Sequence, residues 1–356
     1  MRQIYKNVIV SAALAMMATA CSNGDTSYSL LASGQSFKQA TVNTKVDILW
    51  VVDNSGSMQP LQDNMTANFN SFMNQFVTKG YDFHLAVTSS DAYRAEPFFQ
   101  NNPTLSKFRD GNGSTHSGVF MITPGTPNLI PTFVNNASLG MTGSGDERVF
   151  SSFKSTLSNS LNSGFLRADS FMGLIILSDE DDFSNPTRPE NTFTGGDHNY
   201  GQAGLETVDS YVNYLDTLTN TTGALRRYSV SAITVMDEAC RAQHAQNAPS
   251  TIVGTRYIDM ANKTDGILGS VCDASYATAL QQIQEHIMEL STQFYLNAKP
   301  VESSIVVTVN GHTVPNNPTN GWSYNPAANS VLFHGSAVPA SGATVGVQFD
   351  PQKLQL

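Results

Sequence analysis

Residues 46–58, VDILWVVDNSGSM, are a nearly continuous apolar run that ends in polar side chains at alternate positions. A run of this length and composition is typical of a strand that is buried on both faces of a parallel sheet. Asp53, Ser55 and Ser57 follow the run directly. The sequence therefore predicts one carboxylate and two hydroxyls on the turn at the carboxyl end of a buried strand.

Downstream of this turn, apolar runs alternate with segments of helical spacing. A helix with Pro60 in its first turn carries apolar residues from position 61 to 77. Strands are predicted at 83–87, 119–122, 171–177, 228–235 and 256–260, and helices from Asp146 on, over 205–218, and after a cap at Asp273. This alternation predicts an α/β fold with a doubly wound, mainly parallel sheet flanked by helices, which is a Rossmann-like arrangement.

The chain divides into four parts. Residues 1–20 read as a signal peptide, 21–43 as a flexible tether rich in small polar residues, and 44–297 as the α/β domain. In residues 298–356 the runs SIVVTVNG, GWSYNP, NSVLFHG and TVGVQFD show no helical period. They predict a small C-terminal all-β appendage of about four strands, without a cluster of acids or histidines.

The first residues resemble a bacterial lipoprotein signal. Arg2 and Lys6 precede a short apolar run that ends in small residues just before Cys21. The resemblance implies cleavage before Cys21 and lipidation of its thiol, although Ala18 stands where that family usually has Leu. An ordinary secretory signal is the alternative. We expect a lipid-anchored protein of the bacterial cell envelope, and Ser22 would suit sorting to the outer membrane.

Composition narrows the classes of partner. Hydrophobic residues make up 40% of the chain and charged residues only 13%, and the formal net charge is -10. An acidic surface repels phosphate backbones, so we expect no nucleic-acid partner. If Cys21 carries lipid, Cys240 and Cys272 remain, and in an oxidising compartment they are expected to form one disulfide. Two buried free thiols are the alternative.

Three polar segments fall at strand or helix borders in a fixed order. Asp53, Ser55 and Ser57 come first, Thr142 lies in MTGSGDERVF just before a predicted helix, and Asp179 follows the strand in LIILSDEDD. With this order the chain, over about residues 45–295, resembles the von Willebrand factor type A (vWA) family with its metal-ion-dependent adhesion site. In parallel sheets, sites form at the carboxyl ends of strands, so the two acids are expected at one edge.

The resemblance implies roles for these residues. Ser55 and Ser57 would bind a divalent cation directly, Asp53 and Asp179 directly or through water, and Thr142 in either way, with Ser144 as the alternative to Thr142. Hard oxygen ligands suit Mg²⁺, or Mn²⁺ or Ca²⁺. A polar turn whose Ser57 caps the following helix is the simpler interpretation of the first segment.

The resemblance further implies a binding protein rather than an enzyme. Few directly bound carboxylates would leave the cation electron-poor, and an acidic side chain of a protein partner, or a glycan, would fill its open coordination position. The alternatives are a metal-dependent hydrolase that uses the acids at 179–182, and an envelope scaffold with a vestigial site. Asp181 or Asp182 could also form a second, calcium-type site. No Gly-x-Ser-x-Gly, His-Glu-x-x-His or phosphate-loop motif is present.

Overall fold

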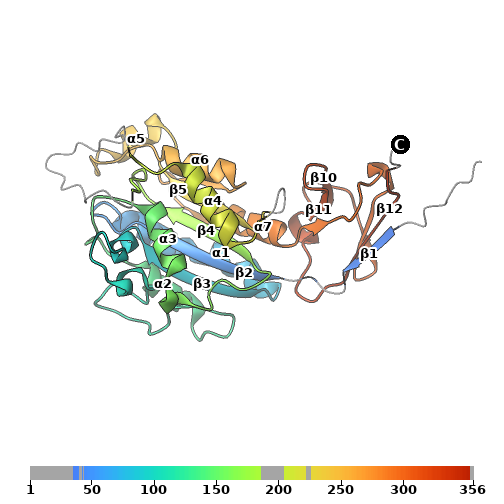
Figure 1. The fold of residues 1–356 in the computed structure, drawn as a ribbon, viewed down its shortest axis with the longest axis horizontal. Helices are drawn as coiled ribbons and strands as arrows, with labels where there is room; N and C mark the ends of the chain where they lie inside the picture. The colour runs from blue at the N-terminus through green and yellow to red at the C-terminus, as the bar shows by residue number, and fades with distance from the viewer. Residues whose placement is uncertain (1–34, 40–41, 43, 186–203, 222–225, 353–356) are drawn as a thin grey trace, which may run out of the picture.

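The computed structural model describes residues 35–39, 42, 44–185, 204–221 and 226–352. Its largest element is a five-stranded sheet in the order β3-β2-β4-β5-β6, in which all neighbouring strands are parallel (Figure 1). The strands are β2 (Lys45–Val52), β3 (Asp82–Ser89), β4 (Phe171–Leu177), β5 (Tyr228–Thr234) and β6 (Leu268–Ser270). The predicted α/β class with a mainly parallel sheet is confirmed.

Helices cover both faces of this sheet, and this explains why β2 and β4 are apolar along almost their whole length. Successive side chains of a strand point to opposite faces. Ile48 and Trp50 therefore pack into one core, and Leu49 and Val51 into the other. The first core includes α1 (Gln59–Thr78), α2 (Leu129–Ala137) and α7 (Ala277–Ser291), and the second includes α3 (Val149–Ser158), α4 (Val208–Leu218) and α6 (Thr255–Lys263).

A glycine permits the close approach of α7 to the sheet. A Cβ atom at Gly173 of β4 would lie 2.7 Å from the Cδ1 atom of Ile287 on α7. Ile287 is buried in the core that also holds α1. A larger residue at position 173 would force the side chain of Ile287 to move. None of the described helices is both long and apolar enough to cross a membrane.

Two of the predicted strands are wrong. Residues 256–260 lie in α6, where Tyr257, Met260 and Ala261 are buried at helical spacing. A segment this short does not distinguish the spacing of apolar residues in a helix from that in a strand. The strand at this edge of the sheet is β6, which is only three residues long. Residues 119–122 form no strand, and Ile122 makes only an isolated antiparallel bridge to Leu85.

Two predicted helix starts also differ from the structure. α3 begins at Val149 rather than at Asp146, because Asp146 and Glu147 lie buried in the preceding loop. α7 begins at Ala277, with Tyr276 in the cap position, rather than directly after Asp273. Acidic residues before a segment of helical spacing suit either the first helical turn or the loop that precedes it. The sequence alone therefore does not locate the start of the helix.

The C-terminal part consists of two small antiparallel sheets, and each of the four predicted runs contains a strand (Figure 1). One sheet has the order β1-β12-β8-β9 and the other the order β10-β11-β7. The strands are β7 (Phe294–Tyr295), β8 (Val306–Val309), β9 (His312–Val314), β10 (Trp322–Asn325), β11 (Ser330–Phe333) and β12 (Val345–Phe349). Single 3₁₀ turns occur at Ala92–Ala95, Pro103–Ser106, Ser160–Asn162, Glu302–Ser304 and Gly335–Ala337.

The first strand of the C-terminal unit comes from the segment predicted to be a tether. β1 (Gln35–Gln39) pairs antiparallel with β12, with Gln35 opposite Phe349. The backbone of a strand needs only a partner edge, and β12 offers one that is far away in sequence. The α/β domain is therefore inserted between the first strand of the antiparallel unit and its remaining strands.

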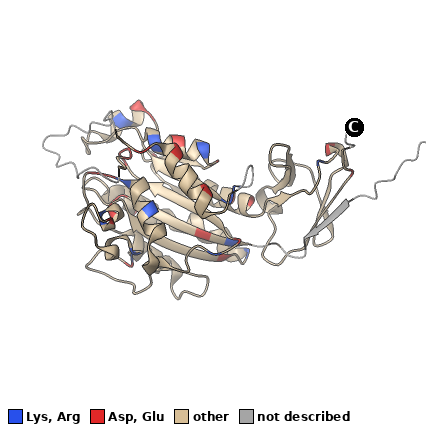
Figure 2. Cartoon of the chain, in the orientation of Figure 1, with Lys and Arg blue, Asp and Glu red and all other residues tan. Residues whose placement is uncertain are grey.

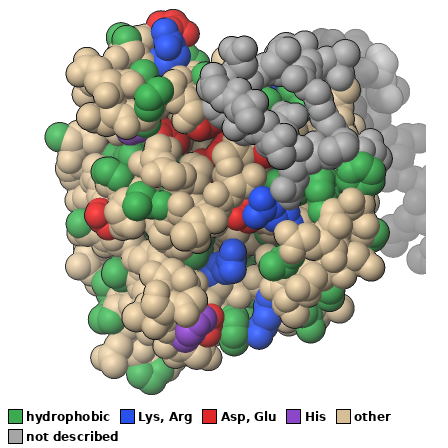
Figure 3. All heavy atoms as spheres, turned by 90° about the vertical axis from the view of Figure 1, so that its left-hand side faces the viewer, with side chains coloured by type: hydrophobic (Ala, Val, Ile, Leu, Met, Phe, Trp, Pro, Cys, Tyr) green, Lys and Arg blue, Asp and Glu red, His purple; other side chains and the backbone are tan. Residues whose placement is uncertain are grey.

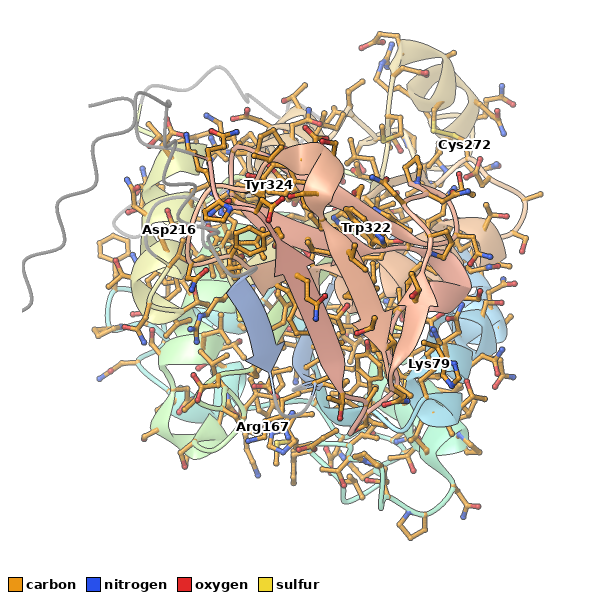
Figure 4. The ribbon with its side chains drawn as sticks, turned by 90° about the vertical axis from the view of Figure 1, so that its right-hand side faces the viewer. Lys79, Arg167, Asp216, Cys272, Trp322 and Tyr324 are labelled. Carbon is orange, nitrogen blue, oxygen red and sulfur yellow. A yellow bond between two sulfur atoms is a disulfide. The ribbon has the colours of Figure 1, made fainter. Side chains whose placement is uncertain are left out.

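Polar contacts join the two units where α1 and α7 end. Lys79, the residue that follows α1, is labelled in Figure 4. Lys79 donates from Nζ to the carbonyl oxygen of Val338 at 2.9 Å. His334, which follows β11, lies 3.3 Å from Glu289 of α7 through Nδ1, and its Nε2 lies 2.7 Å from the hydroxyl of Ser323 on β10. The antiparallel unit thus lies at the end of the sheet opposite to the carboxyl ends of its strands (Figure 1).

Candidate functional site

The carboxyl ends of β2 and β4 bring Asp53 and Asp179 to the same edge of the sheet. The two strands are neighbours, with Val52 opposite Leu177, and the amide of Asp53 donates to the carbonyl of Leu177 at 2.9 Å. Both carboxylates are fully buried. Figure 3 faces this end of the molecule and shows acidic side chains in a recess of its surface.

Asp53 is held by hydrogen bonds from three segments. Its Oδ1 accepts from the amide of Ser55 at 2.8 Å and from the hydroxyl of Ser90 at 3.2 Å, and its Oδ2 accepts from the hydroxyl of Ser178 at 2.7 Å. Burial, and after it the nearby charge of Asp179, nevertheless raise the pKa of Asp53 to about 7. A neighbouring positive charge would stabilise the ionised form of this carboxyl.

Ser57 connects the first segment to the third. Its hydroxyl donates to Oδ1 of Asp179 at 3.0 Å, across 122 positions of sequence. The interpretation of Ser57 as a helix cap is wrong, because Met58 occupies the cap position of α1 and no side chain caps this helix. The side chain of Ser57 is instead directed at the buried carboxylate.

Ser55 is the unusual member of this group. Its hydroxyl oxygen is buried and makes no well-formed hydrogen bond to a described residue, although the hydroxyl lies close enough to the Asp53 carboxylate to lower the pKa of that group. Leaving a buried polar group without a partner costs about 1–3 kcal/mol. The oxygen therefore has lone pairs that are free for a ligand at the position where the sequence predicts a cation.

The loop that contains Thr142 reaches the first segment through its glycine. The amide of Gly143 donates to the carbonyl of Asn54 at 2.8 Å, and a Cβ atom at Gly143 would lie 2.6 Å from that same carbonyl oxygen. The next amide, of Ser144, donates to Asp91 at 3.1 Å. The loop is thus next to the site, but the side chain of Thr142 is exposed.

Two further buried acids lie near Asp53: Glu147, to which sequence reasoning gave no role at the site, and Glu180, which it named only among the acids at 179–182 of the alternative hydrolase. Glu147 is completely buried, and its carboxyl lies beside that of Glu180. Burial raises its pKa well above the ordinary value, and the charges of Glu180 and Asp53 raise it further. Burial likewise raises the pKa of Glu180 to about 8. The only sequence signal for these residues is their place beside the predicted ligands.

Asp181 and Asp182 have structural partners. Asp181 accepts from the hydroxyl of Thr255 and from the amide of Arg256. Asp182 accepts from the amide of Phe150 at 2.9 Å, from the amide and hydroxyl of Ser184, and from the guanidinium of Arg256 at 3.1 Å. These bonds join the β4–α4 loop to α3 and α6, which favours a structural role over a second cation site.

Cys240 and Cys272 form the disulfide that the sequence predicts. Cys240 lies on α5 (Glu238–His244), and Cys272 follows β6. The last residue of α5, His244, lies with its Nε2 atom 2.9 Å from Oδ2 of Asp179. Sequence reasoning missed His244, since nothing in the sequence around it distinguishes it from the other histidines.

The donor set determines what the site could hold. Within the described parts of the chain, no group of three His, Cys, Asp or Glu side chains is placed to hold a metal ion. A cation here would therefore need hydroxyl ligands as well, and Ser55 and Ser57 supply them between two buried carboxylates. Carboxylate and hydroxyl oxygens fit Mg²⁺ or Ca²⁺ and do not suit zinc or copper. Cys21 lies outside the described residues.

Comparison with known proteins gives only distant matches. No family model and no curated protein matches this sequence. Among known structures, the pilus adhesin SpaC from Lactobacillus rhamnosus GG, in its open conformation, has a TM-score of 0.38 and 14% identity, over 86% of this chain and 38% of that chain. Proximal thread matrix protein 1 from the mussel byssus has a TM-score of 0.36 and 11% identity, over 74% of this chain and 51% of that chain. The chain thus spans about half or less of the length of these proteins, and similarity at this level assigns it no function.

Proposed function

We propose that this chain is a non-catalytic, cation-dependent adhesion or ligand-binding protein that is anchored to the bacterial cell envelope through lipid on Cys21. Ser55 and Ser57 would bind Mg²⁺ directly, or Mn²⁺ or Ca²⁺ in its place. Asp53 and Asp179 would hold it directly or through water. The resemblance to the vWA family supports this assignment, with Thr142 as the further ligand that the family pattern implies.

The observation that carries the proposal is the buried Ser55 hydroxyl, which makes no well-formed hydrogen bond to a described residue, near the buried carboxylates of Asp53 and Asp179. Two buried like charges next to each other destabilise the folded protein, and a divalent cation would offset both. An ion with one open coordination position would then accept a carboxylate from a protein partner. An acidic protein needs such an ion to attract an acidic ligand, because its own charge of -10 opposes the contact.

A hydrolase that uses the acids at 179–182 is the weaker candidate. Asp181 and Asp182 already accept hydrogen bonds from neighbouring loops and helices, so they are poorly available to an ion or a water molecule. A scaffold with a vestigial site would leave the cost of the Ser55 hydroxyl and the buried carboxyls without compensation. A cation-dependent binding site therefore explains the burial and contacts of more of these side chains than a hydrolase or a scaffold does.

The test is calorimetric titration of Mg²⁺, Mn²⁺ and Ca²⁺ into protein that begins after Cys21. Asp53→Asn and Ser55→Ala should abolish or strongly weaken saturable binding, and Thr142→Ala should weaken it less if Thr142 binds through water. Asp63→Asn removes one exposed carboxylate from α1 and is the matched control. Binding that is equal in Asp53→Asn and wild type would contradict the proposal.

The anchor has a separate test. Metabolic labelling with a radioactive fatty acid should mark the wild-type protein, and Cys21→Ser should remove the label and release the protein from the membrane fraction. A protein that fractionates as soluble in both forms would contradict lipid anchoring but would leave the proposed cation site unaffected.

A further inference from the structure

We propose that His244 is a positioning residue of the candidate cation site and that the Cys240–Cys272 disulfide holds it in place. This inference rests on the proposed function, because it concerns the orientation of Asp179, one of the proposed ligands. Its starting point is that the carboxylate of Asp179 has a different partner on each oxygen.

The two partners fix the plane of this carboxylate. Oδ1 of Asp179 accepts from the hydroxyl of Ser57 at 3.0 Å, and Oδ2 lies 2.9 Å from Nε2 of His244. An ionised carboxylate only accepts, so Nε2 of His244 carries the hydrogen in this contact. With Oδ2 held by the ring, Oδ1 is the oxygen that remains in contact with Ser57, a proposed direct ligand.

Hydrogen-bonded partners of ligating carboxylates orient them and tune their affinity for metal. His244 suits this role because it lies between the Asp179 carboxylate and solvent. The His244 side chain is 17% exposed, and the Asp179 carboxylate beneath it is fully buried. The ring therefore also limits access of water to the outer oxygen of the ligand. Without it, the carboxylate would be free to rotate away from Ser57.

The position of His244 depends on a helix that has little else to hold it. α5 is seven residues long, and Cys240 is its only buried residue. A helix this short is not stable by itself in water. Asp237 caps it by accepting from the amide of Cys240 at 2.8 Å, and the disulfide ties Cys240 to the segment after β6.

Helical spacing connects the disulfide to the ring. Cys240 and His244 are four residues apart and therefore lie on the same face of α5. The bond that attaches this face to the end of the sheet thus also directs His244 at Asp179. The disulfide thereby acquires a specific purpose: it sets the geometry of one proposed ligand.

The first experiment measures Mg²⁺ and Mn²⁺ affinity by calorimetry in wild type, His244→Ala, His244→Gln and the control Gln243→Ala. Gln243 is the exposed neighbour of His244 on the same helix. His244→Ala should weaken binding about 10- to 100-fold, which is the range for loss of such a partner. His244→Gln keeps an N–H donor and should restore part of the affinity, and Gln243→Ala should match wild type.

The second experiment tests the disulfide through a double-mutant cycle. Replacing Cys240 and Cys272 with serine should weaken the binding of Mg²⁺ when His244 is present. The same replacement should have almost no further effect on Mg²⁺ affinity in His244→Ala. Backbone amide hydrogen exchange, measured on the cation-free proteins, gives a second readout that requires no bound cation. The amides of α5 should exchange faster without the disulfide, while those of β4 should not.

The outcomes separate the inference from the function on which it rests. Wild type that binds no cation would refute the proposed function, and the inference would fall with it. If wild type binds cation and His244→Ala binds it equally or more tightly, the inference about His244 is overturned and the proposed function is not. Additive losses in the cycle would show that the disulfide acts through some other residue, which would overturn its assigned purpose.

Discussion

Ser57 and Asp179 are 122 positions apart in sequence, and a hydrogen bond of 3.0 Å joins their side chains. The contact exists because β2 and β4 are neighbours in a parallel sheet, so the residues that follow both strands meet at one edge. It brings two of the three polar segments of the predicted site into direct contact. The third segment reaches the same place through Gly143 and Asn54.

Gly143→Ala should damage both stability and cation binding. The new methyl group would lie 2.6 Å from the carbonyl oxygen of Asn54, so the loop that carries Thr142 would have to shift. Overpacking of this kind costs about 1–3 kcal/mol. Urea unfolding should show this loss, whereas Gly125→Ala, which meets no atom closer than 4.0 Å, should leave the unfolding free energy almost unchanged.

The stability of the cation-free protein should fall as pH rises. Asp53 and Glu180 have folded-state pKa values of about 7 and about 8, above the values of 3.8 and 4.5 for the unfolded chain. The folded state therefore binds more protons than the unfolded state between about pH 4 and pH 8, and each carboxyl loses stabilisation as pH rises through its folded pKa.

Urea unfolding in a chelator at pH 5 and pH 8 measures this dependence. Glu147→Gln removes a third buried carboxyl whose pKa is raised, so it should increase the unfolding free energy at pH 8 more than at pH 5. Equal stability of the wild-type protein at both pH values would show that these acids are not as desolvated as the structure has them.

Asp182→Ala should be among the most destabilising single changes. It would leave the guanidinium of Arg256 without its carboxylate and remove acceptors for Phe150 and Ser184. Breaking one partner of a buried ion pair costs about 3–5 kcal/mol. Thermal and urea unfolding would measure the loss, and Asp209→Ala, which removes an exposed acid paired with Lys263, should cost far less because surface ion pairs add little to stability.

His334→Ala should loosen the junction between the two units and leave the candidate site intact. It removes contacts to Glu289 and Ser323, which together are worth about 1–3 kcal/mol. Limited proteolysis should release the C-terminal unit faster, while the affinity for Mg²⁺ stays unchanged. His312→Ala, at an exposed position of β9, is the control. A change in cation affinity would show that the junction and the site are coupled.

The sequence by itself determined the elements whose pattern is strong. The buried strands β2, β4 and β5, the helix α1 and the presence of small C-terminal strands follow from hydrophobic periodicity, which depends only on local order in the chain. The placement of Asp53 and Asp179 at one edge also follows, because parallel strands bring their carboxyl ends together. The pairing of Cys240 with Cys272 follows once Cys21 is assigned to the lipid anchor, because the chain has three cysteines.

Tertiary structure decided what depends on partners distant in sequence. Residues 256–260 form a helix because one face of α6 packs on the sheet, and β1 joins the C-terminal unit because β12 offers it an edge. No local pattern marks His244 or Glu147 as part of the site. Their positions result from packing and the disulfide, and only folding brings their side chains to Asp179 and Asp53.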